Sequence, residues 1–183
     1  MTAPDWQPTL VGPTLLVRPL RADDLEMLYA AAADPEIWAI HPEPTRYLRP
    51  VFEAGFFASA LASGAAFVVI DRATERIIGS SRYYDSKPEE RSVCIGFTFL
   101  ARTHWGGTTN GELKRLMLDY AFQYVDTVWF HIGKTNWRSR KAVEKVGAVF
   151  AHEDEFVVHG TSSTHVLYRI DRPGGAVNDS DPS

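Results

Sequence analysis

Cysteine is nearly absent from this chain, since Cys94 is the single thiol among 183 residues. One cysteine excludes an internal disulfide framework and is typical of proteins kept in a reducing compartment. The N-terminus also lacks the basic and apolar segments that together define a secretory signal peptide. We therefore expect a cytoplasmic protein.

Long apolar runs and an excess of positive charge are missing too. No apolar run reaches the roughly 20 residues that a membrane-spanning helix requires, so no membrane partner is expected. Acidic residues (23) outnumber basic ones (19), for a net charge of −4, which argues against direct nucleic-acid binding as the main function. No metal site is expected. With 45% apolar and 23% charged residues, the composition is that of an ordinary globular protein.

The length of 183 residues suits one domain with a sizeable core. Residues 1–13 contain three prolines and are expected to form an irregular lead-in. Residues 171–183 are rich in Asp, Gly, Pro and Ser and are expected to be a disordered tail. Residues 14–170 between them are expected to form a single domain without an internal repeat.

The first half of this domain changes from helical spacing of apolar residues to successive β-rich runs. Pro35, Pro42 and Pro44 interrupt residues 34–44, which are therefore expected to form a loop. The other segments are predicted as a strand at 14–17, helices at 20–33 and 47–62, and strands at 66–71, 77–84 and 92–99.

The strand at 92–99 is expected to alternate between two faces. Its larger side chains would share one face, namely Val93, Ile95, Phe97 and Phe99. The other face would carry Cys94, Gly96 and Thr98. That second set is too small and polar to fill a core by itself, so we expect it to border a cavity.

A glycine-rich turn at 103–108 follows this strand and leads into an apolar-periodic helix. Thr109 and Glu112 have the spacing of a capping box, which predicts that the helix begins at Thr109. Free amides and the positive end of the helix dipole at such a turn suit a phosphate or pyrophosphate. The alternative is that the glycines serve only steric needs, because the turn matches neither the dinucleotide fingerprint nor the P-loop pattern.

The rest of the domain is predicted to add a strand, a helix and a final hairpin. The strand lies at 127–132 and the helix at 136–146, with Asn136 as its N-cap and Gly147 just after its end. Strands at 149–158 and 164–170 are expected to form a hairpin about residues 160–163.

This order of elements resembles the GNAT superfamily of acyl-CoA N-acyltransferases, and more specifically its RimJ/RimL-type branch of ribosomal-protein N-terminal acetyltransferases. The resemblance runs from Leu15 to Ile170. It rests on four segments: Leu15 to Leu20 leading into Asp24, Ile95 to Leu100, Trp105-Gly106-Gly107, and Asn136 to Ser139 followed by Glu144 to Gly147. The implied fold is α/β (α+β), with a mixed, mostly antiparallel central sheet flanked by helices.

The resemblance implies an acetyl-CoA-dependent N-acetyltransferase that passes an acetyl group directly to a primary amine. The expected acceptors are, in order, a protein or peptide N-terminus, a small amine and a lysine side chain. A rival interpretation is a GNAT-fold module that binds acyl-CoA with little or no catalysis, as a sensor or interaction domain. A homodimer is left open.

The resemblance also assigns coenzyme A to particular residues. The pyrophosphate would lie on main-chain amides of the turn, although Thr108 and Asn110 stand where the family pattern has Gly and Gly/Ala. Asn136 would bind the pantetheine arm, and Arg138 and Arg140 are our choices for phosphate contacts. The full expected coenzyme A set is Phe99, Leu100, Trp105, Gly106, Gly107, Thr108, Thr109, Asn110, Gly111, Asn136, Arg138 and Arg140.

The catalytic groups follow less directly. A backbone N–H within Phe97, Thr98 and Phe99 would bond the thioester carbonyl, where negative charge develops. Many relatives have Glu at the position of Cys94 and Tyr at the position of Val143, so the usual base and acid are missing here. Ser139 is the candidate general acid, with a purely structural role in the helix as the alternative.

The proton acceptor is left open among five candidates, namely His104, His131, Tyr83, Tyr84 and Asp85. We favour a packed structural role for His131, and deprotonation through water or capture of the neutral amine. Trp38, His41 and Tyr83 are expected to bind the acceptor amine, although Trp38 can equally be a core residue.

Overall fold

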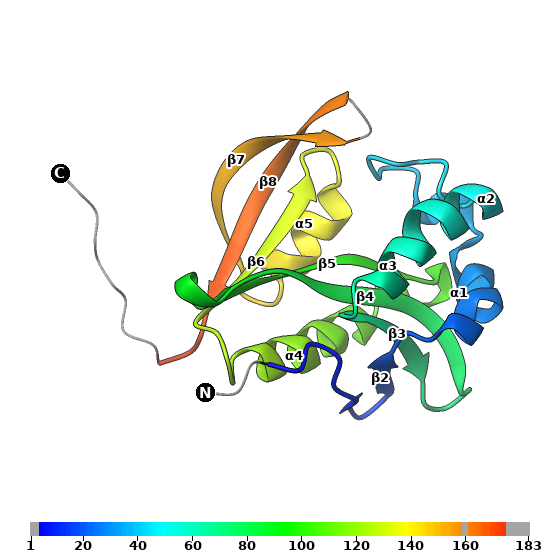
Figure 1. The fold of residues 1–183 in the computed structure, drawn as a ribbon, viewed down its shortest axis with the longest axis horizontal. Helices are drawn as coiled ribbons and strands as arrows, with labels where there is room; N and C mark the ends of the chain where they lie inside the picture. The colour runs from blue at the N-terminus through cyan, green and yellow to red at the C-terminus, as the bar shows by residue number, and fades with distance from the viewer. Residues whose placement is uncertain (1–3, 159–160, 175–183) are drawn as a thin grey trace.

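The computed structural model describes residues 4–158 and 161–174, which form an eight-stranded sheet in the order β1-β2-β3-β4-β5-β6-β8-β7 (Figure 1). The strands are β1 (Leu10–Val11), β2 (Leu15–Pro19), β3 (Ala66–Asp71), β4 (Arg76–Lys87), β5 (Ser92–Leu100), β6 (Thr127–Gly133), β7 (Val149–Val158) and β8 (Thr161–Asp171). The β5–β6 pair is parallel, and the other neighbouring pairs in this sheet are antiparallel. The mixed, mostly antiparallel sheet predicted from the sequence is confirmed.

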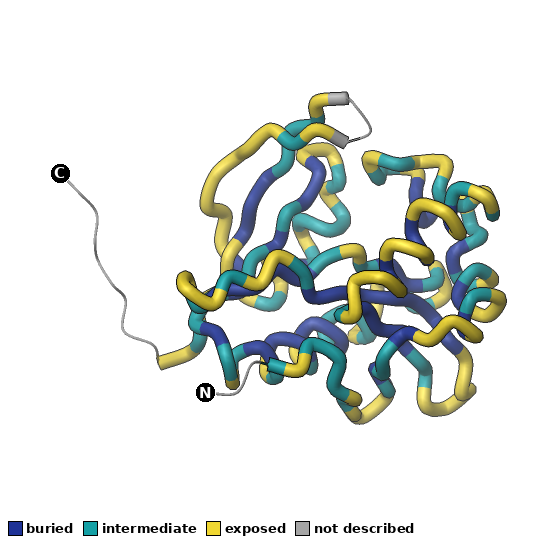
Figure 2. Tube along the Cα trace, in the orientation of Figure 1, coloured by how far each residue is buried: buried dark blue, intermediate teal, exposed yellow. Residues whose placement is uncertain are grey.

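Helices cover both faces of the sheet. One face is covered by α1 (Leu25–Ala32) and by a longer helix that runs through α2 (Arg49–Val51), a π-helical segment (Phe52–Phe57) and α3 (Ala58–Ala62). We call this the α1–α3 face. The opposite face is covered by α4 (Thr109–Ala121) and α5 (Trp137–Glu144), and we call it the α4–α5 face. Each face buries its own hydrophobic cluster, so the strands lie in the buried middle layer (Figure 2).

The alternation predicted for the strand at 92–99 is wrong beyond Gly96. The β4–β5 register shifts between the pairs Ser80↔Phe99 and Arg82↔Gly96, so β5 carries one extra residue there. Phe97 takes up the bulge with a positive φ of 52°, unusual for a residue with a side chain. Val93 and Ile95 therefore lie on the α4–α5 face, whereas Phe99 joins the cluster on the α1–α3 face.

The helix α4 begins at Thr109 as predicted, but the predicted capping box is wrong. Thr108 is the N-cap residue and makes no side-chain capping bond. The carboxylate of Glu112 instead accepts hydrogen bonds from the backbone N–H groups of Thr14 and Leu15, and from the Thr14 hydroxyl at 2.6 Å. Glu112 therefore joins α4 to β2 and is directed away from the turn, because a partner distant in sequence competes successfully for its oxygens.

Several boundaries differ from the predictions. The lead-in contains β1, and its Trp6 packs against Tyr83 with ring centroids 4.9 Å apart. The strand β8 already begins at Thr161, so the predicted turn at 160–163 is too long, and Gly160 lies outside the described residues. Asp171 closes β8 rather than beginning a tail, and residues 175–183 lie outside the described residues.

The helix α5 and the residues that flank it match their prediction closely. Asn136 caps α5 by accepting a hydrogen bond from the Ser139 N–H at 3.2 Å. Gly147 has a φ of 98° just beyond the helix, a conformation that costs glycine little. Among the described residues, no helix has the length and apolar character to cross a membrane.

Candidate active site

The strands β5 and β6 pair over only part of their length. The paired residues are Ser92↔Thr127, Val93↔Val128 and Cys94↔Trp129, although β5 continues to Leu100 and β6 to Gly133. In Figure 1 the β6–β8–β7 part of the sheet accordingly turns away from β4 and β5. Beyond Cys94, none of the described strands pairs with the β6-facing edge of β5, and the bulge at Phe97 lies in that stretch. This opening exposes main-chain groups beside the bulge.

The turn before α4 offers a run of unpaired amides. Trp105 N–H donates to the Arg102 carbonyl and Glu112 N–H to the Thr108 carbonyl. Between them, the amides of Gly106 to Gly111 make no hydrogen bond to any described residue. Gly106 has a φ of 75°, and a Cβ added at Gly106 or Gly107 would meet nothing within 4 Å. Unpaired amides at the start of a 13-residue helix make an anion site.

Arg138 lies beside this turn, but Arg140 is held elsewhere. The guanidinium of Arg138 stacks on the Trp105 ring, 3.7 Å from its centroid, and the Trp105 indole N–H donates to the Leu100 carbonyl at 2.9 Å. These contacts link α5, the turn and the end of β5. Arg140 donates to the Tyr168 hydroxyl at 3.2 Å and to the Lys134 carbonyl at 3.0 Å.

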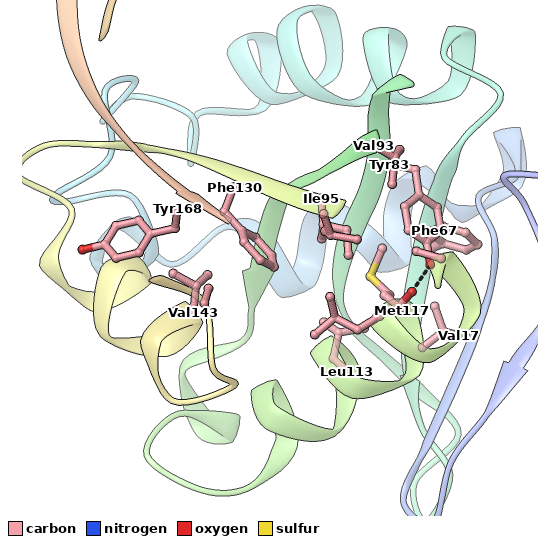
Figure 3. Close-up of a cluster of buried hydrophobic side chains, with 14 of the residues drawn as sticks. Val17, Phe67, Tyr83, Val93, Ile95, Leu113, Met117, Phe130, Val143 and Tyr168 are labelled. Carbon is pink, nitrogen blue, oxygen red and sulfur yellow. Dashed lines mark hydrogen bonds between the residues drawn. The ribbon is translucent and has the colours of Figure 1, made fainter. Parts of the chain in front are cut away.

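The two positions considered for the general acid, Val143 and Ser139, have different surroundings. Val143, at the position where many relatives have Tyr, is 3% exposed in the cluster between α5 and the sheet (Figure 3). It has no proton to give. Ser139 is half-buried in the first turn of α5, and its hydroxyl makes no hydrogen bond to any residue in the described ranges. Ser139 is therefore free to act on a ligand.

Lys114, which was not among the predicted site residues, and Asn110, which was predicted to bind coenzyme A, both lie on the buried side of α4. Lys114 is 4% exposed; its Nζ donates to Thr98 of β5 at 2.8 Å and lies 5.4 Å from the ring centroid of Phe130 of β6. It therefore bridges the two strands where they diverge. Asn110, one turn earlier, has a buried Oδ1 without a partner in the described part of the chain. The sequence held one sign that Lys114 would be buried: it lies four residues before Leu118, on the same face of the helix.

On the α1–α3 face, Tyr84, Cys94 and His131 come together at the point of divergence. The Cys94 thiol lies 3.6 Å from Nε2 of His131, and the rings of Tyr84 and His131 meet edge to face at 5.9 Å. Burial raises the pKa of Cys94 to about 12, so it stays a thiol. Burial also lowers the pKa of His131, so its imidazole is neutral at pH 7.

A neighbouring glycine makes room for this cluster. A Cβ at Gly96 would lie 2.8 Å from the Tyr84 ring, so glycine is needed for the ring to cross β5. Tyr84 also contacts the Phe97 ring at 5.2 Å. Cys94 and Gly96 lie on this face under the Tyr84 ring, whereas Thr98 points to Lys114 on the other face, so the predicted grouping of these three residues beside a cavity is wrong for Thr98 and stays a prediction for the other two.

Two of the three predicted acceptor residues are core residues. Tyr83 is 1% exposed on the α4–α5 face, and its hydroxyl donates to the Met117 carbonyl at 2.6 Å (Figure 3). Trp38 is 2% exposed, and its indole N–H donates to the Ala32 carbonyl. Both predictions fail because strand alternation and helix packing direct these rings inward. The neighbouring Tyr84 takes the position expected for Tyr83.

His41 remains at the rim of the α1–α3 face. Its Nδ1 accepts a hydrogen bond from the Glu43 N–H at 2.9 Å, and its Nε2 lies 3.3 Å from Arg46. Burial lowers the pKa of His41 to about 3, so it is neutral at pH 7. His104, by contrast, lies beside Asp71 at 3.4 Å, on a strand remote from the divergence.

In the described ranges, no group of three or more His, Cys, Asp or Glu side chains is placed to hold a metal ion. The arrangement instead combines an anion site at a helix start, an opened parallel strand pair and a neutral histidine. Such an arrangement suits an extended ligand that carries a phosphate group at one end.

Residues 14–149 match the family model of the acetyltransferase (GNAT) domain, which covers most of the chain. The chain belongs to the GNAT acetyltransferase family and is an N-acetyltransferase. Comparison with curated protein sequences gives no match.

Solved structures share the fold at low sequence identity. A GCN5-related N-acetyltransferase from Brucella melitensis is 20% identical, with a TM-score of 0.80 over 90% of this chain and 79% of that one. A Vibrio cholerae chain described as a candidate ribosomal-protein-serine acetyltransferase is 13% identical, with a TM-score of 0.72 over 90% and 97%. The microcin C7 self-immunity acetyltransferase MccE, in complex with acetyl-CoA and AMP, is 12% identical, with a TM-score of 0.73 over 92% and 99%.

Proposed function

We propose that this protein transfers an acetyl group from acetyl-CoA directly to a primary amine. One observation carries the proposal: β5 and β6 part after Cys94 and Trp129, beside the bulge at Phe97 and in line with the unpaired amides before α4. A donor with a pyrophosphate and an extended arm fits that arrangement. A relative of the same fold binds acetyl-CoA.

The donor would be held mainly by main-chain groups. The amides of Gly106 to Gly111 would bind the pyrophosphate, helped by the dipole of α4. Arg138 is close enough to the turn to add a charged contact. The arm would continue between β5 and β6 past Phe99 and Leu100, with Asn110, Lys114 and Asn136 along its path. Acetyl-CoA supplies the activated acyl group as a thioester.

The acceptor must lose a proton before it can attack, because an ordinary amine is charged at pH 7. We assign that proton to His131, which is neutral and lines the divergence next to Cys94. The other candidates fit less well. Burial raises the pKa of Tyr83 and Tyr84, so neither is a base at pH 7, and His104 is bonded at Asp71.

In the transfer, the amine nitrogen forms a bond to the thioester carbonyl carbon and the carbon–sulfur bond breaks. A backbone N–H within Phe97 to Phe99 would stabilise the negative charge on the carbonyl oxygen. The hydroxyl of Ser139 would give its proton to the departing thiolate and recover one from solvent. His131 would take the first ammonium proton before attack, and the second, released from nitrogen as the amide forms, would pass to solvent, from which Ser139 recovers its own. No covalent enzyme intermediate is required.

Among acceptor classes, a protein or peptide N-terminus comes first, as in the RimJ/RimL-type branch. The candidate ribosomal-protein-serine acetyltransferase of the same fold supports this choice. A small amine is the second candidate. A buried, reduced Cys94 supports a cytoplasmic location. The rival function, acyl-CoA binding without catalysis, is weakened by the neutral histidine and the unbonded Ser139 hydroxyl beside the expected thioester.

The test is thiol release from acetyl-CoA over a panel of peptides and small amines, with a thermal-shift titration of coenzyme A in parallel. We expect a shift with coenzyme A and thiol release with at least one amine. A shift without turnover on any acceptor would support the binding module instead. No shift and no turnover would remove the coenzyme A assignment.

A further inference from the structure

Two arginines lie within the α1–α3 face next to the bulge, and the proposed reaction gives neither a role. Arg82, on β4, is only 7% exposed, and its guanidinium stacks 4.0 Å from the ring centroid of Phe97. Arg46, in the loop before α2, lies 5.2 Å from the ring centroid of Trp38 and 5.4 Å from that of Phe56. Each guanidinium therefore lies on aromatic rings rather than in open water.

Arg82 has no counter-ion among the residues that the structure describes. Its Nη2 makes one long hydrogen bond, 3.3 Å, to the Ser59 hydroxyl, and its buried Nε has no partner in the same part of the chain. Its Nη1 makes no hydrogen bond within the described ranges, and no carboxylate of those residues forms an ion pair with it. Burial lowers the pKa of Arg82 to about 10, so it is still a cation at pH 7. A buried cation without an anion is strongly unfavourable, so such a group points to a ligand.

Arg46 places a second positive charge near Arg82 on the α1–α3 face. Burial lowers its pKa to about 10, Glu43 opposes that shift, and the charge of Arg82 lowers it further. The two cations are therefore near enough to repel one another. Both side chains lie on the α1–α3 face. An anion bound to Arg82 would therefore offset the repulsion between the two cations and would also supply Arg82 with an ion-pair partner.

Space for a ligand exists beside Arg82. A cavity of about 310 Å³ is lined by residues 82–86 of β4, Arg82 among them, together with Trp6, Ser63, Ala65 and Val93. Phe97, whose ring stacks on Arg82, is 42% exposed and forms the bulge where the thioester carbonyl is expected. An anion on Arg82 would therefore lie beside the Phe97 ring, next to the bulge.

We propose that Arg82 binds a carboxylate of the acceptor, so that this enzyme acts on amines that carry a carboxylate close to the reacting nitrogen. This inference rests on the proposed N-acetyltransferase function. Two sources have that chemistry: a free amino acid, and a chain whose first residue is acidic. The planar guanidinium suits a carboxylate better than a lysine would, because it offers parallel donors in one plane.

The competing explanation is that Arg82 is only a packing residue, held by the Phe97 ring and Ser59. That role would affect stability and all acceptors equally. Carboxylate recognition would instead affect acceptors with the negative group and leave uncharged analogues less changed. Selectivity between matched acceptors therefore separates the two explanations where overall activity does not.

The experiment measures kcat/KM for two matched pairs of acceptors. One pair is glutamyl-alanyl-alaninamide and glutaminyl-alanyl-alaninamide, and the other is alanine and alaninamide. The variants are Arg82→Met and Arg82→Lys, with Arg76→Met as control, since Arg76 is an exposed arginine of the same strand. Because amine basicity differs within the second pair, the diagnostic quantity is the carboxylate-to-amide ratio of each variant divided by that of the wild type.

We expect the wild type to prefer the glutamyl over the glutaminyl peptide, or alanine over alaninamide after the basicity correction, by at least about tenfold. Arg82→Met should reduce that ratio about 10- to 100-fold, Arg82→Lys should restore part of it, and Arg76→Met should keep it. The preferred pair identifies the source of the carboxylate. If a variant does not fold, the wild-type preference between the peptides still decides.

Turnover of neutral amines with no preference for either carboxylate acceptor would overturn the carboxylate inference and leave the N-acetyltransferase function intact. An equal loss with all acceptors in Arg82→Met would also overturn it, in favour of packing. Failure of the proposed function is distinguishable, because acetyl-CoA would then yield no free thiol with any acceptor and coenzyme A would give no thermal shift.

Discussion

The Nζ of Lys114 lies 2.8 Å from Oγ1 of Thr98, which in turn lies 2.8 Å from the Ser81 hydroxyl. This chain of contacts runs from α4 through β5 to β4 on the α4–α5 face. Burial alone lowers the pKa of Lys114 to about 7, from the usual value near 10.5. An amine in this state exchanges its proton near neutral pH, directly beneath the diverging strands.

Lys114 should make the stability of the protein depend on pH. Between about pH 7 and 10 the unfolded chain binds the lysine proton and the folded chain does not, so the free energy of unfolding rises with pH. We expect a gain of about 2 kcal/mol from pH 7 to pH 9, since each full proton contributes about 1.4 kcal/mol per unit. Urea unfolding at both pH values would measure it.

Lys114→Met is the matched variant for this effect. Methionine keeps most of the side-chain length and has no proton to lose, so its unfolding free energy should lack the rise seen in the wild type. Other groups that titrate in the window are common to both proteins and cancel in the comparison. Parallel pH curves for the two proteins would show that Lys114 is charged or exposed in the folded state.

Gly107 should tolerate a side chain in the folded protein but not in the donor complex. A Cβ there meets nothing within 4 Å, so Gly107→Asp should change the melting temperature little. Its carboxylate would place a like charge beside the bound pyrophosphate, and we expect the Kd for acetyl-CoA to rise at least about tenfold.

Gly55→Asp is the control for this variant. Gly55 is equally open, but it lies in the helical segment on the opposite face of the sheet from α4. Calorimetric titration of acetyl-CoA into both variants would separate a local effect from a general one. Equal affinities for the two variants would place the pyrophosphate elsewhere.

Substitutions of Ser139 and Asn136 should affect different properties, namely the turnover rate and the stability of α5. Since the Ser139 hydroxyl makes no hydrogen bond within the described ranges, Ser139→Ala should leave the melting temperature within a degree or two and lower kcat about 10- to 100-fold. Asn136→Ala removes a cap and should cost about 1 kcal/mol of stability. Unchanged kcat in Ser139→Ala would leave the thiolate to be protonated by solvent.

His131 should set the acidic limb of the pH profile. Because burial lowers its pKa below the usual 6.5, kcat/KM should fall only as the pH drops through that lower value, where the imidazole becomes charged and stops accepting a proton. His131→Gln should abolish this limb and lower kcat/KM about 10²- to 10⁴-fold at pH 7. A retained limb would show that another group or water takes the proton.

The sequence by itself determined the order of strands and helices and the position of the glycine-rich turn before α4. Those features depend on local causes, namely the helical spacing after Thr109, the glycines before it, and Asn136 as a cap. Order and spacing were also enough to show the GNAT resemblance, and the family match confirms it. The location of the pyrophosphate stays a prediction.

Only the tertiary structure decided which side chains face the reaction. An extra residue in β5 turned Phe97 outward, and the neighbouring strand Arg76–Lys87 directed Tyr83 into the core and Tyr84 toward the site. The Glu112 carboxylate on α4 accepts a hydrogen bond from Thr14, 98 positions away, and the side chains of Lys114 and Arg82 became buried. These outcomes depend on register and on contacts between distant segments, whose energies no local pattern encodes.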